Sequence, residues 1–215
     1  MSDEIKLVIG LVGLKAAGKD TLGRLLVERG FIQFRTSDAI RADLKAFGNA
    51  NPSTAELIET GSAGRAVSHD NGYWMRRLAE LAAVSGHKRI VFNGVRHPDE
   101  FAALREIYGD KLLMAGVVAP TGLRGQRFLE RGQAGDPCEF QKFLAIDDTD
   151  RGIGEPAHGQ QVDRALACVP CENVYNNVGT LEELAAWVDS LLDRAINNVS
   201  RLEARGSNIE ADDRS

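Results

Sequence analysis

A glycine-rich turn near the start of the chain, Gly13–Lys19, constrains the fold more than any other feature of the sequence. Residues 6–12 before it form an apolar run rich in valine and isoleucine, which is typical of a buried strand. Residues 21–28 after it carry leucine at helical spacing and are followed by Gly30, which predicts a helix that ends there. Two glycines five residues apart, then a lysine, between a strand and a helix, form the P-loop pattern. The turn therefore predicts a binding site for the phosphates of a nucleotide.

The chemistry of such a turn explains its residues. Backbone N–H groups at a helix N-terminus bind phosphate oxygens, and the helix dipole favours their negative charge. We expect Lys19 to place a positive charge on the β- and γ-phosphates and so to act in catalysis. Asp20 follows the lysine where a serine or threonine is usual, and either the Asp20 carboxylate or the Thr21 hydroxyl can serve Mg²⁺. The residues expected to bind ATP here are Gly13, Leu14, Lys15, Ala16, Ala17, Gly18, Lys19, Asp20 and Thr21.

Composition restricts the class of protein. The chain has 215 residues and a formal net charge of −5, which suits one α/β domain and disfavours a protein that holds nucleic acid mainly through phosphate contacts. No apolar run approaches the roughly 20 residues of a membrane span, and no signal peptide precedes the first strand, so we expect a cytoplasmic protein without membrane association. The three cysteines do not form a disulfide framework. For Cys168 and Cys171 we expect packing rather than a zinc or redox site, because no second pair of ligands accompanies them.

Two segments are candidates for the side of the cleft opposite the nucleotide. Residues 36–38 are expected to cap a helix in which Asp38 and Arg41 lie one turn apart and face the acceptor. The alternative is a capping aspartate with a solvated arginine. Residues 60–65 form a Gly/Ser-rich segment that we expect to be a mobile turn, with Arg65 either a substrate clamp or a solvated side chain.

A further strand, residues 88–93, ends in Asn93, where many P-loop proteins have a magnesium-binding aspartate. Arg96 follows at the carboxyl edge of the predicted sheet, where open α/β proteins bind ligands. His97 is expected to cap the next helix, with Pro98 at its first position.

After a fourth strand, residues 112–118, the chain carries Arg124, Arg127 and Arg131 at helical spacing. Residues 132–137 break that helix, and we expect a second one from about Cys138 that ends in an acidic cluster. We interpret residues 121–158 as a helical lid in which Arg127 and Arg131 neutralise the transferring phosphoryl group when the lid closes. The alternative is an ordinary solvated helix face.

Four motifs together resemble phage-type deoxynucleoside monophosphate kinases and the kinases related to dephospho-coenzyme A kinase. The P-loop has their Gly-Lys-Asp-Thr form, and three further motifs match theirs: Ser37-Asp38-x-x-Arg41, Asn93-x-x-Arg96-x-x-x-Glu100 and Tyr175-Asn176-Asn177-Val178-Gly179. The resemblance implies an α/β fold of the P-loop NTPase type, with three α/β/α layers, a five-stranded parallel sheet and a helical lid. We expect one kinase domain over residues 1–200. Residues 201–215 are polar and charged and are expected to form a frayed C-terminal tail.

The same resemblance implies ATP with Mg²⁺ as donor, with Asn176 and Gly179 adding to the ATP site. It implies an acceptor site at Asp38, Arg41 and Arg96, to which we add Arg65. Asn93 departs from the family's aspartate and leaves the magnesium arrangement open.

We therefore expect an ATP-dependent kinase that converts a (deoxy)nucleoside monophosphate to the diphosphate. One alternative is a kinase acting on 5-hydroxymethyluracil in phage DNA, for which DNA would be a partner. Another is a module that senses nucleotides without turnover. Small-molecule nucleotides are the expected partners, and the sequence leaves open whether the chain forms a homodimer.

Overall fold

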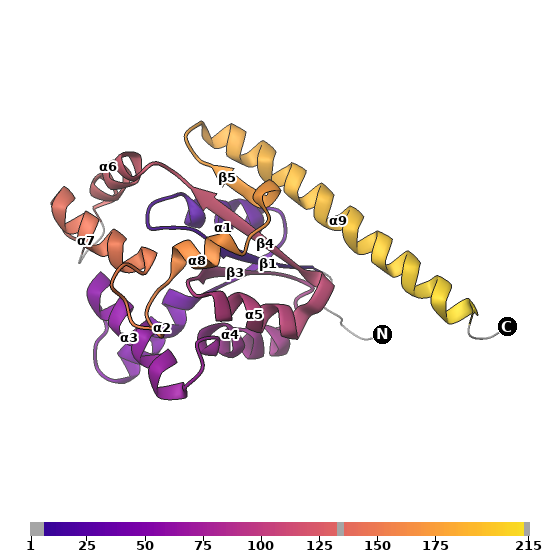
Figure 1. Cartoon of the computed structure of the whole chain (residues 1–215), viewed down its shortest axis with the longest axis horizontal. Coiled ribbons are helices and arrows are strands. Elements are labelled where there is room, and N and C mark those ends of the chain that lie inside the picture. The colour runs from indigo at the N-terminus through magenta and orange to yellow at the C-terminus, as the bar shows by residue number, and fades with distance from the viewer. Residues whose placement is uncertain (1–6, 133–135, 213–215) are drawn as a thin grey trace.

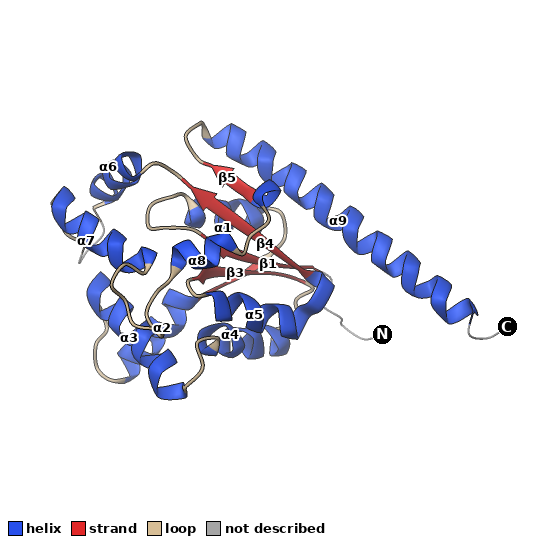
Figure 2. Cartoon of the chain, in the orientation of Figure 1, coloured by secondary structure: helices blue, strands red, loops and turns tan. Residues whose placement is uncertain are grey.

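The computed structural model describes residues 7–132 and 136–212, and a five-stranded parallel sheet lies at its centre (Figure 2). The strand order is β2-β3-β1-β4-β5, so β1 lies in the middle, between β3 and β4. The chain leaves β1 toward β2 on one side, and it leaves the neighbouring strand β3 toward β4 on the other side. This reversal places a crevice at the carboxyl ends of β1 and β3, where the P-loop lies. The strands are β1 Leu7–Val12, β2 Ile32–Arg35, β3 Arg89–Val95, β4 Leu112–Val118 and β5 Val174–Asn176.

Helices cover both faces of this sheet, and the long C-terminal helix extends beyond the rest of the fold (Figure 1). They are α1 Lys19–Glu28, α2 Thr36–Ala46, α3 Thr54–Ser68, α4 Tyr73–Val84, α5 Pro98–Tyr108, α6 Thr121–Arg131, α7 Phe140–Arg151, α8 Val162–Ala167 and α9 Leu181–Asp212, with short 3₁₀ turns at Gly109–Lys111 and Cys171–Asn173. Among the described residues, none of the helices combines the length and the apolar character that crossing a membrane requires.

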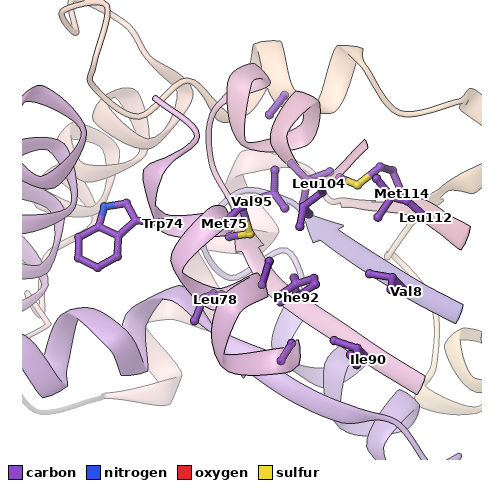
Figure 3. Packing of buried hydrophobic residues seen from close by; sticks show 14 of the residues in the cluster. Val8, Trp74, Met75, Leu78, Ile90, Phe92, Val95, Leu104, Leu112 and Met114 are labelled. Atoms are coloured by element: carbon purple, nitrogen blue, oxygen red, sulfur yellow. The ribbon is translucent and has the colours of Figure 1, made fainter. Parts of the chain in front are cut away.

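The central strand explains why the fold has three layers. Successive side chains of a strand point to opposite faces. Leu7, Ile9 and Leu11 accordingly pack in one cluster with apolar side chains of α1 and α9. Val8 and Val12 pack in a second cluster on the other face, where Figure 3 shows strand residues such as Ile90 and Phe92 beside side chains of α4 and α5. The predicted α/β/α arrangement with a five-stranded parallel sheet is confirmed.

The predicted mobile turn over residues 60–65 is wrong, because this segment lies inside α3. Its glycines serve close packing instead. A Cβ atom on Gly64 would lie 2.7 Å from the ring of Trp74, and the Trp74 indole N–H donates to the carbonyl of Gly61 at 2.8 Å. Glycine at position 64 therefore lets α3 approach α4 across a buried tryptophan.

Three other expectations need correction. The C-terminal segment 201–212 continues α9 as helix rather than forming a frayed tail; residues 213–215 lie outside the described residues. Cys168 and Cys171 are exposed in the connection between α8 and β5, so they do not pack in the core. The second lid helix begins at Phe140 rather than near Cys138. Of the predicted break at 132–137, residues 133–135 lie outside the described part of the chain.

Candidate active site

The P-loop connects β1 to α1 in a conformation that depends on its two glycines. A Cβ atom on Gly13 would lie 2.6 Å from the carbonyl oxygen of Val117 in the neighbouring strand β4, a distance that backbone atoms cannot accommodate. Gly18 has a φ of 110° directly before the first residue of α1, which favours glycine. The N–H groups of the first turn of α1 are consequently open toward a ligand, as an anion site requires.

A cavity of about 440 Å³ lies along the outer side of the P-loop, and we call it the donor cavity. It runs from the P-loop past α6 to the connection between β5 and α9. Its lining is Leu14, Ala16, Gly18, Lys19, Asp20, Thr21, Arg24, Arg127, Arg131, Asn177, Gly179, Thr180, Leu181 and Leu184.

A second cavity of about 160 Å³ lies on the other side of Lys19, toward α2 and α3, and we call it the acceptor cavity. Its lining is Lys15, Ala16, Lys19, Asp20, Arg35, Thr36, Ser37, Arg41, Thr54, Leu57, Asn93, Gly94, Arg96, Arg131 and Asp150. Six of these residues are lysine or arginine and two are aspartate, so the cavity is strongly cationic.

Four residues line both cavities, namely Ala16, Lys19, Asp20 and Arg131. The two cavities thus meet at one lysine, one arginine and one carboxylate. Desolvation by the surrounding protein lowers the pKa of Lys19, and Lys19 in turn lowers the pKa of Asp20. The Asp20 carboxylate is therefore ionised, and a bound phosphate would favour the charged form of Lys19.

The donor set near Asp20 fits a hard divalent cation. Asp20 offers an ionised carboxylate at the junction of the cavities, and Asn93, at the end of β3, donates its side-chain N–H to that carboxylate at 2.9 Å. Asn93 therefore fixes the orientation of the Asp20 carboxylate through this hydrogen bond. Thr21 lines only the donor cavity and not the acceptor cavity. Mg²⁺ is usually bound through one or two carboxylates together with waters and phosphate oxygens.

Arg131 and Arg127 of α6 both reach the site, but at different places. Arg131 lies at the junction and is paired with Asp136 at 2.7 Å; Asp136 also accepts a hydrogen bond from Thr54 of α3 at 2.6 Å. Arg127 lines only the donor cavity and donates to the backbone oxygen of Asn177 at 3.1 Å. Thus Arg131 is the arginine of α6 that lies where the two cavities meet.

Arg124, the first of the three predicted lid arginines, is not part of a cationic face. It is buried in an ion pair with the equally buried Asp147 of α7, and it also donates to the backbone oxygens of Ala119 and Lys15. This pair joins the two lid helices to each other and to the P-loop. Removing one partner of a buried ion pair is strongly destabilising, because it leaves the other charge buried and uncompensated.

We expect Asp147→Ala to lower the free energy of unfolding by about 3–5 kcal/mol, because it leaves the Arg124 guanidinium buried without its carboxylate. Asp148→Ala is the matched control, since Asp148 is exposed on the same helix and should change stability by less than about 0.5 kcal/mol. Urea unfolding of both variants measures the difference. Equal destabilisation by the two substitutions would contradict the structural role of the pair.

Asp150, one turn further along α7, connects the lid to the acceptor side. Its carboxylate accepts the N–H of Lys15 at 2.9 Å and a guanidinium N–H of Arg96 at 2.5 Å, while Gln160 accepts a second bond from Arg96 at 2.8 Å. Surrounding protein lowers the pKa of Lys15 to about 8, mainly by desolvation, with Asp150 acting in the opposite direction. Arg96 is thus held in place by Asp150, which also lines the acceptor cavity, and by Gln160, which does not.

The structure brings most of the predicted site residues together, with three exceptions. Asp38 is exposed and does not line either cavity: α2 begins at Thr36, without a side-chain cap, so Ser37 faces inward instead. Asn176 is also exposed, and its neighbour Asn177 lines the donor cavity and donates to the P-loop carbonyl of Ala17 at 2.8 Å. Arg65 is buried and paired with Glu100 at 3.3 Å, so it is neither on a mobile turn nor solvated.

Sequence analysis missed Asn177, Asp136 and Asp150 as individual residues. The acidic cluster at the end of the lid was visible, but its spacing does not show which carboxylate turns inward. His97 does cap α5 as predicted, with its ring nitrogen accepting from the Asp99 N–H at 3.1 Å.

Comparison with known proteins gives relatives that span most of the chain, although no protein-family model matches it. The chain is 30% identical over 140 residues to a UPF0200 protein of Pyrobaculum aerophilum, covering 65% of this chain and 75% of the relative. It is 26% identical over 193 residues to a UPF0200 protein of Saccharolobus islandicus, covering 89% and 95%.

Solved structures share the fold at low sequence identity. A protein of Thermus thermophilus superposes with a TM-score of 0.53 at 18% identity, covering 89% of this chain and 98% of that one. Shikimate kinase of Bacteroides thetaiotaomicron superposes with a TM-score of 0.50 at 13% identity, covering 87% and 97%. The three-layer sheet arrangement is therefore one that a known kinase also has.

Proposed function

The chain belongs to the UPF0200 family, and from its site we propose that it is an ATP-dependent kinase that phosphorylates a (deoxy)nucleoside monophosphate. The observation that carries the proposal is the junction of the donor and acceptor cavities at Lys19, Asp20 and Arg131. A transferring phosphoryl group needs cations at the point between donor and acceptor, and little other chemistry from the protein.

In this proposal ATP lies in the donor cavity with its phosphates on the P-loop N–H groups. An oxygen of the acceptor forms a bond to the γ-phosphorus while the bond to the β–γ bridging oxygen breaks, so ADP leaves. Lys19 and Arg131 stabilise the charge on the group in transfer. Asp20 would hold Mg²⁺, which when bound neutralises phosphate charge, and Thr21 stays the alternative ligand on the donor side.

The acceptor cavity supports a substrate that is already an anion. Its six cations favour a phosphate group, and Arg41 at its exposed edge and Arg96 deeper inside are placed to bind one. At neutral pH a phosphate monoester carries a nucleophilic oxygen without a proton. Such an acceptor needs no general base.

The carboxylates of the cavity agree with this choice. Among the described residues, those that line it are Asp20, which interacts with Asn93 and Lys19, and Asp150, which interacts with Lys15 and Arg96. Neither is free to remove a proton from a hydroxyl group, and Asp38, first expected to do so, is outside the cavity. This disfavours the hydroxyl of 5-hydroxymethyluracil as acceptor. A module that only senses nucleotides would have no use for a cationic acceptor cavity.

A coupled assay of ADP formation with each of the eight ribo- and deoxyribonucleoside monophosphates, and with DNA containing 5-hydroxymethyluracil, tests the proposal. We expect acceptance of at least one monophosphate and no activity with the DNA. Activity with the DNA alone would overturn the assignment of the acceptor.

Arg41 allows a separate test of the acceptor side. We expect Arg41→Ala to raise the acceptor KM by about 10- to 100-fold, because a charge-assisted hydrogen bond to phosphate is lost, while the Kd of ATP stays unchanged. Lys45→Ala is the matched control, since Lys45 is exposed one turn further along α2 and lines neither cavity. Steady-state kinetics with calorimetric ATP titration measure both. A comparable loss of ATP affinity in Arg41→Ala would place this arginine on the donor side.

A further inference from the structure

The acceptor cavity continues inward to a closed end that the proposed function does not yet use. This inner pocket has a volume of about 50 Å³ and lies between the P-loop, α2 and α3. It shares Lys15, Thr36, Ser37, Thr54, Leu57 and Arg96 with the acceptor cavity, and Ile40, Ile58, Gly61, Arg65 and Gln160 complete its wall. Its volume exceeds that needed for one water molecule.

Arg65 gives this pocket an unsatisfied donor. The side chain is 1% exposed; its Nε donates to the carbonyl of His158 at 2.7 Å and its Nη1 donates to Glu100 at 3.3 Å. Its Nη2 is buried and has no hydrogen-bond partner among residues 7–132 and 136–212. A buried guanidinium nitrogen without an acceptor is costly, so an acceptor atom brought by a ligand would stabilise it.

The charged side chains in the wall of the pocket are positive. Lys15, Arg65 and Arg96 are the cations in its wall. Two buried carboxylates face them: Glu100 accepts from Arg65, and Asp150 accepts from Arg96 and from the backbone of Lys15. No carboxylate accepts from Nη2 of Arg65. Three cations thus face the two carboxylates that accept hydrogen bonds from them, while Glu155 and Asp136 act on Arg65 and Lys15 from farther away. The apolar side chains of Ile40, Leu57 and Ile58 lie beside these charges, where electrostatic attraction is screened least.

We propose that the inner pocket is a subsite for a small oxyanion group of the acceptor, bound by Arg65 Nη2 and by the side chain of Lys15. This inference rests on the proposed kinase function for the identity of the acceptor. If the acceptor is a nucleoside monophosphate, its phosphate lies where the inner pocket opens into the acceptor cavity, so that Arg41 and Arg96 bind it from the acceptor side and one oxygen faces the γ-phosphate. A carboxylate offers the same chemistry, so both groups are tested.

Calorimetric titration with inorganic phosphate and, separately, with acetate tests the subsite. The protein is first saturated with a non-hydrolysable ATP analogue, so that the P-loop is filled. We expect phosphate to bind, and Arg65→Lys and Lys15→Met each to weaken that binding about tenfold or more. Arg65→Lys keeps a cation for Glu100 but removes Nη2. Lys142→Met is the matched control, because Lys142 is exposed on α7 and pairs with Glu139 away from both cavities.

The outcomes separate this inference from the proposed function. Failure to bind the ATP analogue would refute the kinase proposal. Phosphate titration of the wild type and the two variants without the analogue would still test the subsite, because Arg65 is not part of the P-loop. Acetate binding in place of phosphate, lost in Arg65→Lys, would support the subsite and indicate a carboxylate acceptor. Phosphate binding that is unchanged in both variants, or lost only in Arg41→Ala, would overturn the subsite. If Arg65→Lys does not fold, Lys15→Met alone decides, since Lys15 lies in a loop.

Discussion

Replacing Lys19 with alanine should lower kcat by at least about 10²–10³-fold, the usual loss when one preorganised charge-stabilising group is removed from a transition state. Lys19 is one of four residues that line both the donor and the acceptor cavity. Its ammonium group is therefore placed to stabilise negative charge both on the bridging oxygen and on the group in transfer. The fold should survive, because Lys19 lies at the first turn of α1 and not in either core cluster.

Turnover with an accepted monophosphate and thermal unfolding are the measurements for this variant. Lys142→Ala serves as its control, a lysine that is exposed and far from the junction. The account predicts a large loss of kcat in Lys19→Ala with an unchanged melting temperature, and near-normal kcat in the control. Retention of most of the wild-type turnover by Lys19→Ala would exclude phosphoryl transfer at this P-loop.

Arg131→Ala should also reduce kcat strongly, by about 10³-fold, as expected when an arginine finger is lost. Arg131 lies at the junction and is held there by Asp136, which is in turn bonded to α3. Its guanidinium is thus fixed between donor and acceptor before substrate arrives. Charge that develops in the transition state is the interaction most affected, so ATP affinity in the ground state should change little.

Arg127→Ala is the natural comparison, because Arg127 lies one helical turn earlier on α6 and lines only the donor cavity. We expect this variant to lose ATP affinity while kcat is nearly preserved. Single-turnover kinetics and ATP titration of both variants separate the two roles. Equal effects on kcat in the two variants would contradict the assignment of Arg131 to the junction, and unchanged kcat in both would exclude α6 from the chemistry.

The features that could be predicted from the sequence are those fixed by short-range patterns. The strand at Leu7–Val12, the glycine turn and the start of α1 follow from a continuous apolar run, glycine spacing and helical periodicity within about 20 residues. The five-stranded parallel sheet, by contrast, was supplied by the resemblance to known kinases, and the order of its strands required the structure. The direction in which each side chain of the site points could be determined only from the packed structure.

Two errors show why. Gly61 and Gly64 indicated a turn, but Gly64 is needed because Trp74, on the following helix, occupies the space that its side chain would take, and Gly61 offers its backbone carbonyl to the Trp74 indole. Arg124, Arg127 and Arg131 have equivalent spacing, and only the position of Asp147 in the next helix decides that Arg124 is structural. In both cases the deciding partner lies ten or more residues away, where the periodicity of one helix carries no information.

The fate of the γ-phosphate of ATP is the measurement that tests the central claim most directly. ³¹P NMR of a single turnover, with enzyme in excess over ATP and with the accepted nucleoside monophosphate present, follows that phosphorus to its product. The account predicts that it appears as the β-phosphate of a new nucleoside diphosphate, together with ADP, and that Lys19→Ala abolishes the transfer. Recovery of intact ATP, or of inorganic phosphate alone with every monophosphate, would contradict the account.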